Sequence, residues 1–313
     1  MIYEKIIKKE RRKIIFDGHF KSSDGLDTIF FKRIVFKGKN NHIKNKGSDS
    51  NVHLNIFLVH DILEHHGRYL DLANQLVDIL KDKVSICLID LKGHGLSTGT
   101  RHYIQDFREY SSDLVILIRY FKIVNEAKNN RFILVGQGMG ALVCLETYLN
   151  NKNSVNGLII SNPILKNFVP WFKRINFLTN KIKWPLSVLK VPFYFNGFDL
   201  IKEKNSAEDF NSDPLIGHTA TLGLILGVSN SIKFIKEKSF LINIPVLIMV
   251  SKDSLISDHK MSTSFMKTID EKYVKFLSYE RMKHDILNFY ITKNVFNNLT
   301  TWISDEFLEG ELK

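Results

Sequence analysis

Solid apolar runs alternate with amphipathic segments through the first half of the chain. The apolar runs are rich in β-branched residues, which is typical of strands buried on both faces. They are Val52–His60, Val84–Leu91, Phe132–Val135 and Val155–Ser161. The segments between them space their apolar residues at helical intervals. These predicted helices are Tyr69–Leu80, Phe107–Val124 and Ala141–Leu149. The alternation predicts an α/β fold with a mostly parallel sheet covered by helices on both faces.

A different pattern precedes this alternation. Residues 12–21 and 28–37 are two β-rich runs joined by Ser22-Ser23-Asp24-Gly25, which is a turn signal. We therefore expect an N-terminal antiparallel hairpin. Residues 38–51 are polar and low in complexity, and this composition predicts a loop.

The alternation stops near residue 163. Residues 163–240 contain several prolines, many aromatic residues and no clear strand. The aromatic residues are Phe168, Trp171, Phe172, Phe177, Trp184, Phe193, Phe195 and Phe198. We predict a helical cap here, inserted into a core made of residues 1–162 and 241–313. The aromatic residues could form the core of the cap or line a tunnel for an acyl chain, and both interpretations stay open.

The pattern of the core returns after the cap. Apolar strands are predicted at Val246–Val250 and Val274–Leu277, and a last helix at Asn294–Leu308. Since the carboxyl ends of parallel strands meet at one edge of a sheet, ligands of such folds bind outside that edge. The residues that follow the predicted strands are therefore the first place to look for chemistry.

Composition changes this picture little. The 313 residues carry a net charge of +11, with a pI of about 9.4. Lysine is abundant throughout and no RNA-binding aromatic motif is present, so we expect no nucleic-acid partner. The basic balance favours contact with anionic membranes.

No run reaches the roughly 18–20 apolar residues of a membrane span, and charges interrupt the N-terminus, so we expect no signal peptide. Cys87 and Cys144 lie in apolar runs and are expected to be reduced thiols of a cytoplasmic protein at most peripherally attached to membranes.

The first candidate for chemistry is the turn after the third solid strand. Residues 132–146 read FILVGQGMGALVCLE, which predicts a strand, a sharp turn and a helix. A turn of the form G-x-S-x-G presents a catalytic nucleophile at its tip. Here the tip is Gly138, which has no side chain. Glycine adopts the backbone conformation of such a turn with little strain, so we expect the turn to be kept and the attacking oxygen to be lost.

Two further residues complete the constellation by their order. Asp253 follows the predicted strand at Val246–Val250, and His284 follows the last strand. Alone, such an Asp is usually a cap and such a His is usually solvated. The order nucleophile, acid, histidine is that of α/β-hydrolases, so we assign Asp253 and His284 as triad positions. The same pattern assigns the backbone N–H groups of Met139 and Ile62 to an oxyanion hole.

Four segments in the correct order make the chain resemble the monoacylglycerol lipase / lysophospholipase family of α/β-hydrolases, which is of the serine aminopeptidase S33 type. His60-Asp61-Ile62-Leu63-Glu64-His65-His66-Gly67-Arg68-Tyr69 is similar to the family's HGxxEHxxRY segment, and residues 90–99 (DLKGHGLSTG) resemble its D-x-x-G-H-G-x-S-x-G. Residues 135–140 resemble its elbow, and Ser212-Asp213-Pro214-Leu215 its cap segment. The resemblance covers roughly residues 14–308.

The resemblance implies a function as well as a fold. Family members hydrolyse monoacylglycerols, lysophospholipids or small esters with a Ser-Asp-His triad and no cofactor. It places a pocket at seven residues: His60, Asp61, Glu64, His65, Arg68, Tyr69 and Gln137. The partner it implies is a single-chain acyl lipid.

The departures from the family pattern oppose catalysis. Gly138 replaces the nucleophile, Asp61 replaces an oxyanion-loop glycine, and Leu63 replaces a small residue. A carboxylate at Asp61 would oppose the stabilisation of a developing oxyanion. The sequence therefore favours a lipid-binding protein that is catalytically impaired. The alternative is an ester hydrolase that is active through unusual chemistry.

Two other interpretations carry less support. Gly136-x-Gly138-x-x-Ala141 matches a dinucleotide-binding turn, but strands precede it and no carboxylate ends the next strand. The residues His60, Asp61, Glu64, His65 and His66 fit neither H-E-x-x-H nor H-x-x-E-H. We expect no metal site.

Overall fold

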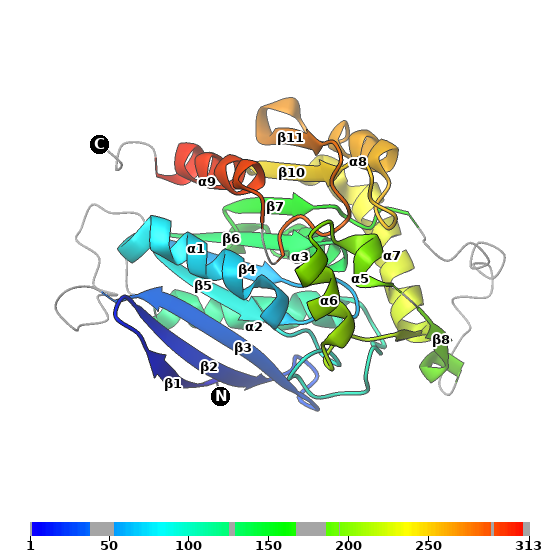
Figure 1. The fold of residues 1–313 in the computed structure, drawn as a ribbon, viewed down its shortest axis with the longest axis horizontal. Coiled ribbons are helices and arrows are strands. Elements are labelled where there is room, and N and C mark those ends of the chain that lie inside the picture. Colours follow the sequence, from blue (N-terminus) through cyan, green and yellow to red (C-terminus); the bar gives the residue numbers. More distant parts are fainter. Residues whose placement is uncertain are drawn as a thin grey trace.

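A single mixed sheet of nine strands runs through the described part of the molecule. The computed structural model describes residues 2–37, 53–124, 129–166, 186–193, 195–288 and 291–308. The strand order is β1-β2-β3-β5-β4-β6-β7-β10-β11. The sheet is strongly twisted and lies between two layers of helices (Figure 1).

Three antiparallel strands form the N-terminal edge of the sheet. They are β1 (Ile2–Lys9), β2 (Lys13–Lys21) and β3 (Thr28–Phe36). The predicted hairpin is confirmed as β2 and β3. Strand β1 was not predicted, because charges interrupt its apolar residues and most of its side chains are exposed.

The other six strands are parallel to one another, as the sequence predicts. They are β4 (His53–Val59), β5 (Val84–Ile89), β6 (Asn130–Gln137), β7 (Gly157–Ser161), β10 (Val246–Ser251) and β11 (Val274–Tyr279). β3 joins this group by pairing antiparallel with β5. Every residue of β5, β7 and β10 is buried, because helices cover both faces.

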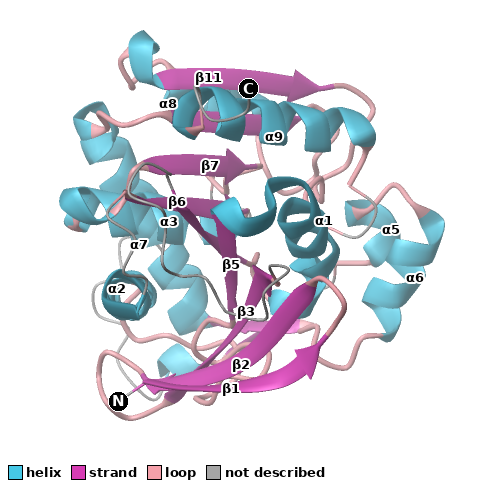
Figure 2. Cartoon of the chain, turned by 90° about the vertical axis from the view of Figure 1, so that its left-hand side faces the viewer, coloured by secondary structure: helices cyan, strands magenta, loops and turns pink. Residues whose placement is uncertain are grey.

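Two apolar clusters hold the helices on the two faces of the sheet (Figure 2). One face carries α1 (Leu70–Leu80) and α9 (Lys293–Phe307). The other carries α2 (Arg108–Val124), α3 (Met139–Asn150), α7 (Leu222–Lys238) and α8 (His259–Met266). Helix α8 was not predicted; its apolar positions are few.

The inserted segment is only partly described. Its elements are β8 (Lys190–Pro192), α5 (Gly197–Leu200), α6 (Lys204–Ser212) and β9 (Thr219–Thr221), followed by α7. The sequence shows no clear strand here, but β8 and β9 pair antiparallel over three residues each, too short to leave a sequence pattern. Helices α5 and α6 lie beyond the carboxyl ends of the parallel strands (Figure 2). The loop predicted at 38–51 and the aromatic residues between 168 and 184 lie outside the described residues, and the division into core and cap stays a prediction.

Two further observations concern the cysteines and the membrane-spanning capacity of the helices. Cys87 and Cys144 are buried free thiols. Within the described ranges, no helix combines the length and apolar character needed to cross a membrane.

Candidate active site

The turn after β6 has the geometry of a sharp strand-to-helix connection. Strand β6 ends at Gln137 and α3 begins at Met139, so Gly138 alone makes the turn, with φ +55° and ψ −110°. Its N–H donates to the Ser161 carbonyl at 2.9 Å. Side chains other than glycine are strained at such a φ. The strained turn typical of a presented nucleophile is therefore formed around a residue that has none.

The space above Gly138 is filled by Asp61. A Cβ atom added to Gly138 would lie 1.9 Å from Oδ1 and 2.1 Å from Cγ of Asp61. These distances are far below van der Waals contact. Glycine at position 138 and the carboxylate at position 61 therefore depend on each other, and a serine cannot occupy the turn while Asp61 keeps this position.

The two backbone donors assigned to the oxyanion hole both hold Asp61. The N–H groups of Met139 and Ile62 each donate to Asp61 Oδ1 at 2.6 Å. An oxyanion hole consists of donors aimed at the position of a developing negative oxygen. In this protein a permanent carboxylate oxygen takes that position.

His284 lies on the other side of the same carboxylate. Its Nε2 is 2.7 Å from Asp61 Oδ2, and both side chains are almost fully buried. The loop that carries His284 is fixed at its backbone, because the side-chain amides of Gln137 and Asn162 both donate to the His284 carbonyl. The assignment of Gln137 to this region thus has a definite geometry, whereas Asn162 was not identified from the sequence.

The structure does not bring Asp253 to His284. The Asp253 side chain is exposed, and the neighbour of His284 Nδ1 is instead Ser254 Oγ, at 2.8 Å. After β10 the chain turns so that residue 253 points to solvent and residue 254 points inward. The Ser254 hydroxyl stabilises that turn by accepting the N–H groups of Ile256 and Ser257. No pattern in the sequence distinguishes the two neighbouring positions.

These contacts fix the proton of His284 at the wrong nitrogen for ester hydrolysis. An ionised carboxylate only accepts hydrogen bonds, so the proton lies on Nε2 and the Ser254 hydroxyl donates to Nδ1. A histidine that activates a nucleophile needs its lone pair on Nε2 and a carboxylate at Nδ1. The neutral hydroxyl of Ser254 cannot stabilise an imidazolium as that carboxylate does.

His60 holds the loop that carries Asp61. Its Nε2 accepts the Leu91 N–H at 3.0 Å, so Nδ1 carries the proton and donates to the Asp61 carbonyl at 2.7 Å. Complete burial lowers the pKa of His60 to about 4, against the opposing charge of Asp90. The ring is therefore neutral at physiological pH and has one fixed tautomer.

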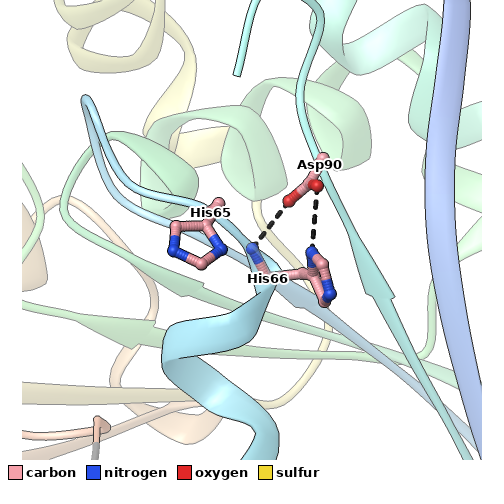
Figure 3. Close-up of side chains that lie close together, drawn as sticks. All are labelled: His65, His66 and Asp90. Carbon is pink, nitrogen blue, oxygen red and sulfur yellow. Dashed lines mark hydrogen bonds and ion pairs between the residues drawn. The ribbon is translucent and has the colours of Figure 1, made fainter. Parts of the chain in front are cut away.

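Asp90 anchors the same loop from the end of β5. It accepts the His66 N–H at 2.7 Å, His66 Nδ1 at 2.9 Å and the Leu96 N–H at 2.7 Å. Figure 3 shows the two bonds to His66. Burial alone would raise the pKa of Asp90, but the hydrogen bonds and the charge of His66 lower it to about 2.

His65, His66 and Asp90 lie close enough together to be considered as metal ligands (Figure 3). Their nitrogen and oxygen atoms already take part in hydrogen bonds. His65 Nδ1 accepts the Gly67 N–H, and His65 Nε2 is bonded to the Asp213 carboxylate at 2.8 Å. Both Asp90 oxygens are occupied by N–H donors. The arrangement fits a hydrogen-bonded frame, which ties the loop to the Asp213 segment of the insertion.

The carboxylates of Asp61, Glu64 and Asp285 are buried beside His284 together with the guanidinium of Arg68. Glu64 accepts the Tyr69 hydroxyl at 2.9 Å, and Asp285 lies 3.5 Å from the Arg68 guanidinium. Burial, together with the Asp285 and Asp61 charges, holds the pKa of Glu64 well above its usual value. Burial also raises the pKa of Asp285, although Arg68 opposes this. Glu64, Arg68 and Tyr69 thus lie in one cluster, to which the structure adds Asp285.

The fold and the elbow define an α/β-hydrolase. The family model described as serine aminopeptidase, S33 matches residues 50–288, and the chain belongs to that family, in its monoacylglycerol lipase / lysophospholipase branch.

Curated relatives agree with this placement. A monoglyceride lipase homolog from Monkeypox virus is 25% identical over 256 residues, covering 79% of this chain and 88% of the relative. Human monoglyceride lipase is 23% identical over 256 residues, covering 80% and 82%.

A solved structure shows the same fold. A soluble variant of the monoglyceride lipase from Saccharomyces cerevisiae, in complex with a substrate analog, superposes with a TM-score of 0.74. Its sequence identity is 16%, over 92% of this chain and 94% of that chain. At this identity the likeness supports the fold alone.

Proposed function

We propose that this protein binds single-chain acyl lipids of the monoacylglycerol or lysophospholipid type and is catalytically impaired as an ester hydrolase. The observation that carries the proposal is the position of the Asp61 carboxylate. It occupies both the space of the missing nucleophile and the oxyanion hole.

Three features act together against ester hydrolysis. No hydroxyl stands at the elbow, because residue 138 is glycine. The carbonyl oxygen of an ester cannot enter the hole, because Asp61 Oδ1 already takes both donors. His284 carries its proton on the nitrogen that should accept one. Loss of the hole alone would cost orders of magnitude in rate, since removal of one hole donor typically costs about 10²–10³-fold.

The ligand class is supported by the relatives. The curated relatives include proteins named monoglyceride lipase, and one solved structure of that name holds a substrate analog. In this chain the elements that surround such a ligand, the elbow, the Asp61 loop and the His284 loop, are all formed. A cytoplasmic location and contact with anionic membranes remain predictions from composition.

The hydrolysis test compares four proteins on a short-chain ester and on a monoacylglycerol. They are the native chain, Gly138→Ser, Asp61→Gly with Gly138→Ser, and that double variant with His284→Ala added. We expect activity only in the double variant, since Asp61 obstructs a serine in the single one. Efficient ester hydrolysis by the native chain would contradict the proposal.

The binding test uses a non-hydrolysable ether analog of a monoacylglycerol. A ligand that binds only the folded state raises the apparent stability, by about 2.7 kcal/mol at 100 times its Kd. We expect the analog to raise Tm and glycerol, which lacks the chain, to leave it unchanged. An unchanged Tm with the analog at its solubility limit would refute lipid binding.

A further inference from the structure

Asp61 places its two oxygens at the two positions that define the reaction centre of this fold. Oδ1 lies in the hole between the N–H groups of Met139 and Ile62, and Oδ2 faces His284 Nε2 at 2.7 Å, where the nucleophile's oxygen would stand. We propose that Asp61 is itself a nucleophile, which attacks a saturated carbon that bears a leaving group, as in an alkyl halide or a terminal epoxide. The inference rests on the same position of Asp61 as the proposed function but does not require lipid binding.

The occupied hole decides which carbon can be attacked. Attack on a carbonyl carbon creates a negative oxygen that needs the hole, and that hole is full. Attack on a saturated carbon creates no such oxygen, because the charge leaves with the departing group. Carboxylates are established nucleophiles in enzymes, and this one is held in one orientation by three hydrogen bonds.

The first step forms an ester of Asp61. Oδ2 donates an electron pair to the saturated carbon, the new carbon–oxygen bond forms, and the bond to the leaving group breaks with its electron pair. A halide departs as the anion. In an epoxide the ring oxygen takes the pair and then a proton from water, so it remains on the product. No oxidant, reductant or cofactor is needed.

Formation of the ester changes which ring nitrogen of His284 carries the proton. The negative charge that held a proton on Nε2 is gone. Ser254 Oγ, 2.8 Å from Nδ1, already accepts the N–H groups of Ile256 and Ser257, and it accepts a protonated Nδ1 by giving up the longer of these two bonds, that of Ile256 at 3.3 Å. Nδ1 can therefore carry the proton while Nε2 presents its lone pair to a water molecule. A carboxylate at that position would fix one tautomer, whereas the hydroxyl serves both.

In the second step the oxyanion hole stabilises a developing negative charge. The water loses a proton to His284 Nε2 and attacks Asp61 Cγ, and the negative charge develops on Oδ1 between the two N–H donors. Collapse breaks the bond between Cγ and Oδ2, and the released alkoxide takes the proton from His284. The products are an alcohol and an acid, or a diol from an epoxide. Asp61 is regenerated with one oxygen from water.

The test uses 1-bromobutane and 1,2-epoxybutane, chosen small because Asp61 is 3% exposed. In heavy-oxygen water, the native chain should release bromide or diol and gain heavy oxygen in the peptide that contains Asp61. His284→Ala should slow the second step by about 10²–10⁴-fold and retain a butyl or hydroxybutyl ester on Asp61. Asp61→Asn should neither react nor carry the adduct, and Asp199→Asn, an exposed carboxylate, serves as the matched control with native behaviour.

Two results would overturn the proposal. One is product release by Asp61→Asn equal to that of the native chain. The other is a His284→Ala protein without an ester on Asp61, and this result does not depend on the folding of the Asp61 variant. Lipid binding is measured separately by Tm, so its failure and the failure of alkyl transfer are distinguishable.

Discussion

The frame of the candidate site and its centre are built on different principles. In the frame, Asp90 holds His66, and His60 holds the backbone of Asp61 and Leu91, through buried hydrogen bonds. In the centre, Gly138 and Asp61 stand where the resemblance leads one to expect a serine and a glycine, and Ser254 lies beside His284 Nδ1, where Asp253 was expected. The frame fixes the shape of the loops without taking part in the chemistry. The residues at the centre can therefore differ while the fold around them stays the same.

The largest effect is expected in the frame, on replacing Asp90 by alanine. Its buried carboxylate accepts three hydrogen bonds, and removal leaves their donors without a partner. Breaking a buried pair of this kind costs about 3–5 kcal/mol. Urea unfolding of Asp90→Ala should show this loss, and Asp199→Ala, which is exposed, should unfold like the native chain. A loss under about 1 kcal/mol would mean that the frame does not carry the stability assigned to it.

The next effect lies in the centre and tests the dependence of Gly138 on Asp61. An alanine at position 138 should cost about 2–3 kcal/mol of unfolding free energy, because it adds backbone strain to a collision with the Asp61 carboxylate. With Asp61→Gly already present the collision is absent, and only the strain remains. A double-mutant cycle should therefore give a coupling of about 1–2 kcal/mol. Additive effects would show that Asp61 moves aside without cost.

The third effect is the pH dependence of stability, which arises from two histidines that folding withdraws from water, the buried His60 of the frame and the half-buried His102. Burial lowers the pKa of His60 and His102 to about 4 in the folded state. The unfolded chain binds these protons more readily, so the stability is fully present above pH 6.5 and is lost as pH falls toward 4. Each residue contributes about 1.4 kcal/mol per pH unit in that window.

His102 offers the cleaner substitution. Its φ is +54°, a conformation that asparagine tolerates better than most residues. Between pH 6.5 and 5 the unfolding free energy of His102→Asn should fall with a slope shallower by one proton than that of the native chain. Parallel slopes would assign the pH dependence to other groups.

The same contrast explains what the sequence could predict. Strands such as β5 and β10 are continuous apolar runs, and the elbow has a local motif, so periodicity and short patterns locate them. The donor Met139 follows from the elbow and the donor Ile62 from the loop after an earlier strand, and the structure aims both at one oxygen. Strand β1 lies at an exposed edge and has no buried face to leave a pattern.

The missing parts of the site depend on contacts between distant segments. The pairing of Asp61 with His284 joins residues 223 positions apart. Asn162 reaches the His284 loop from the end of β7, and the buried side chain of Asp285 lies beside that of Arg68. That Asp61 occupies the oxyanion hole follows only from the orientation of its side chain, which the sequence does not give. The sequence showed that a carboxylate was near, but not that it fills the place of the nucleophile.

The smallest effect distinguishes Ser254 from Asp253 as the neighbour of His284. The Ser254 hydroxyl makes one bond to the ring and accepts two backbone N–H groups, so Ser254→Ala should cost about 0.5–1.5 kcal/mol. Asp253→Ala removes an exposed side chain and should change the unfolding free energy by less than about 0.5 kcal/mol. If Asp253→Ala is the more costly of the two, the acid predicted from the sequence does support His284, and the inward turn at Ser254 is wrong. If the order is as expected, the centre of the site departs from the triad pattern at the histidine as well as at the elbow, and Ser254→Asp should raise the ester hydrolysis of the variant already changed at positions 61 and 138.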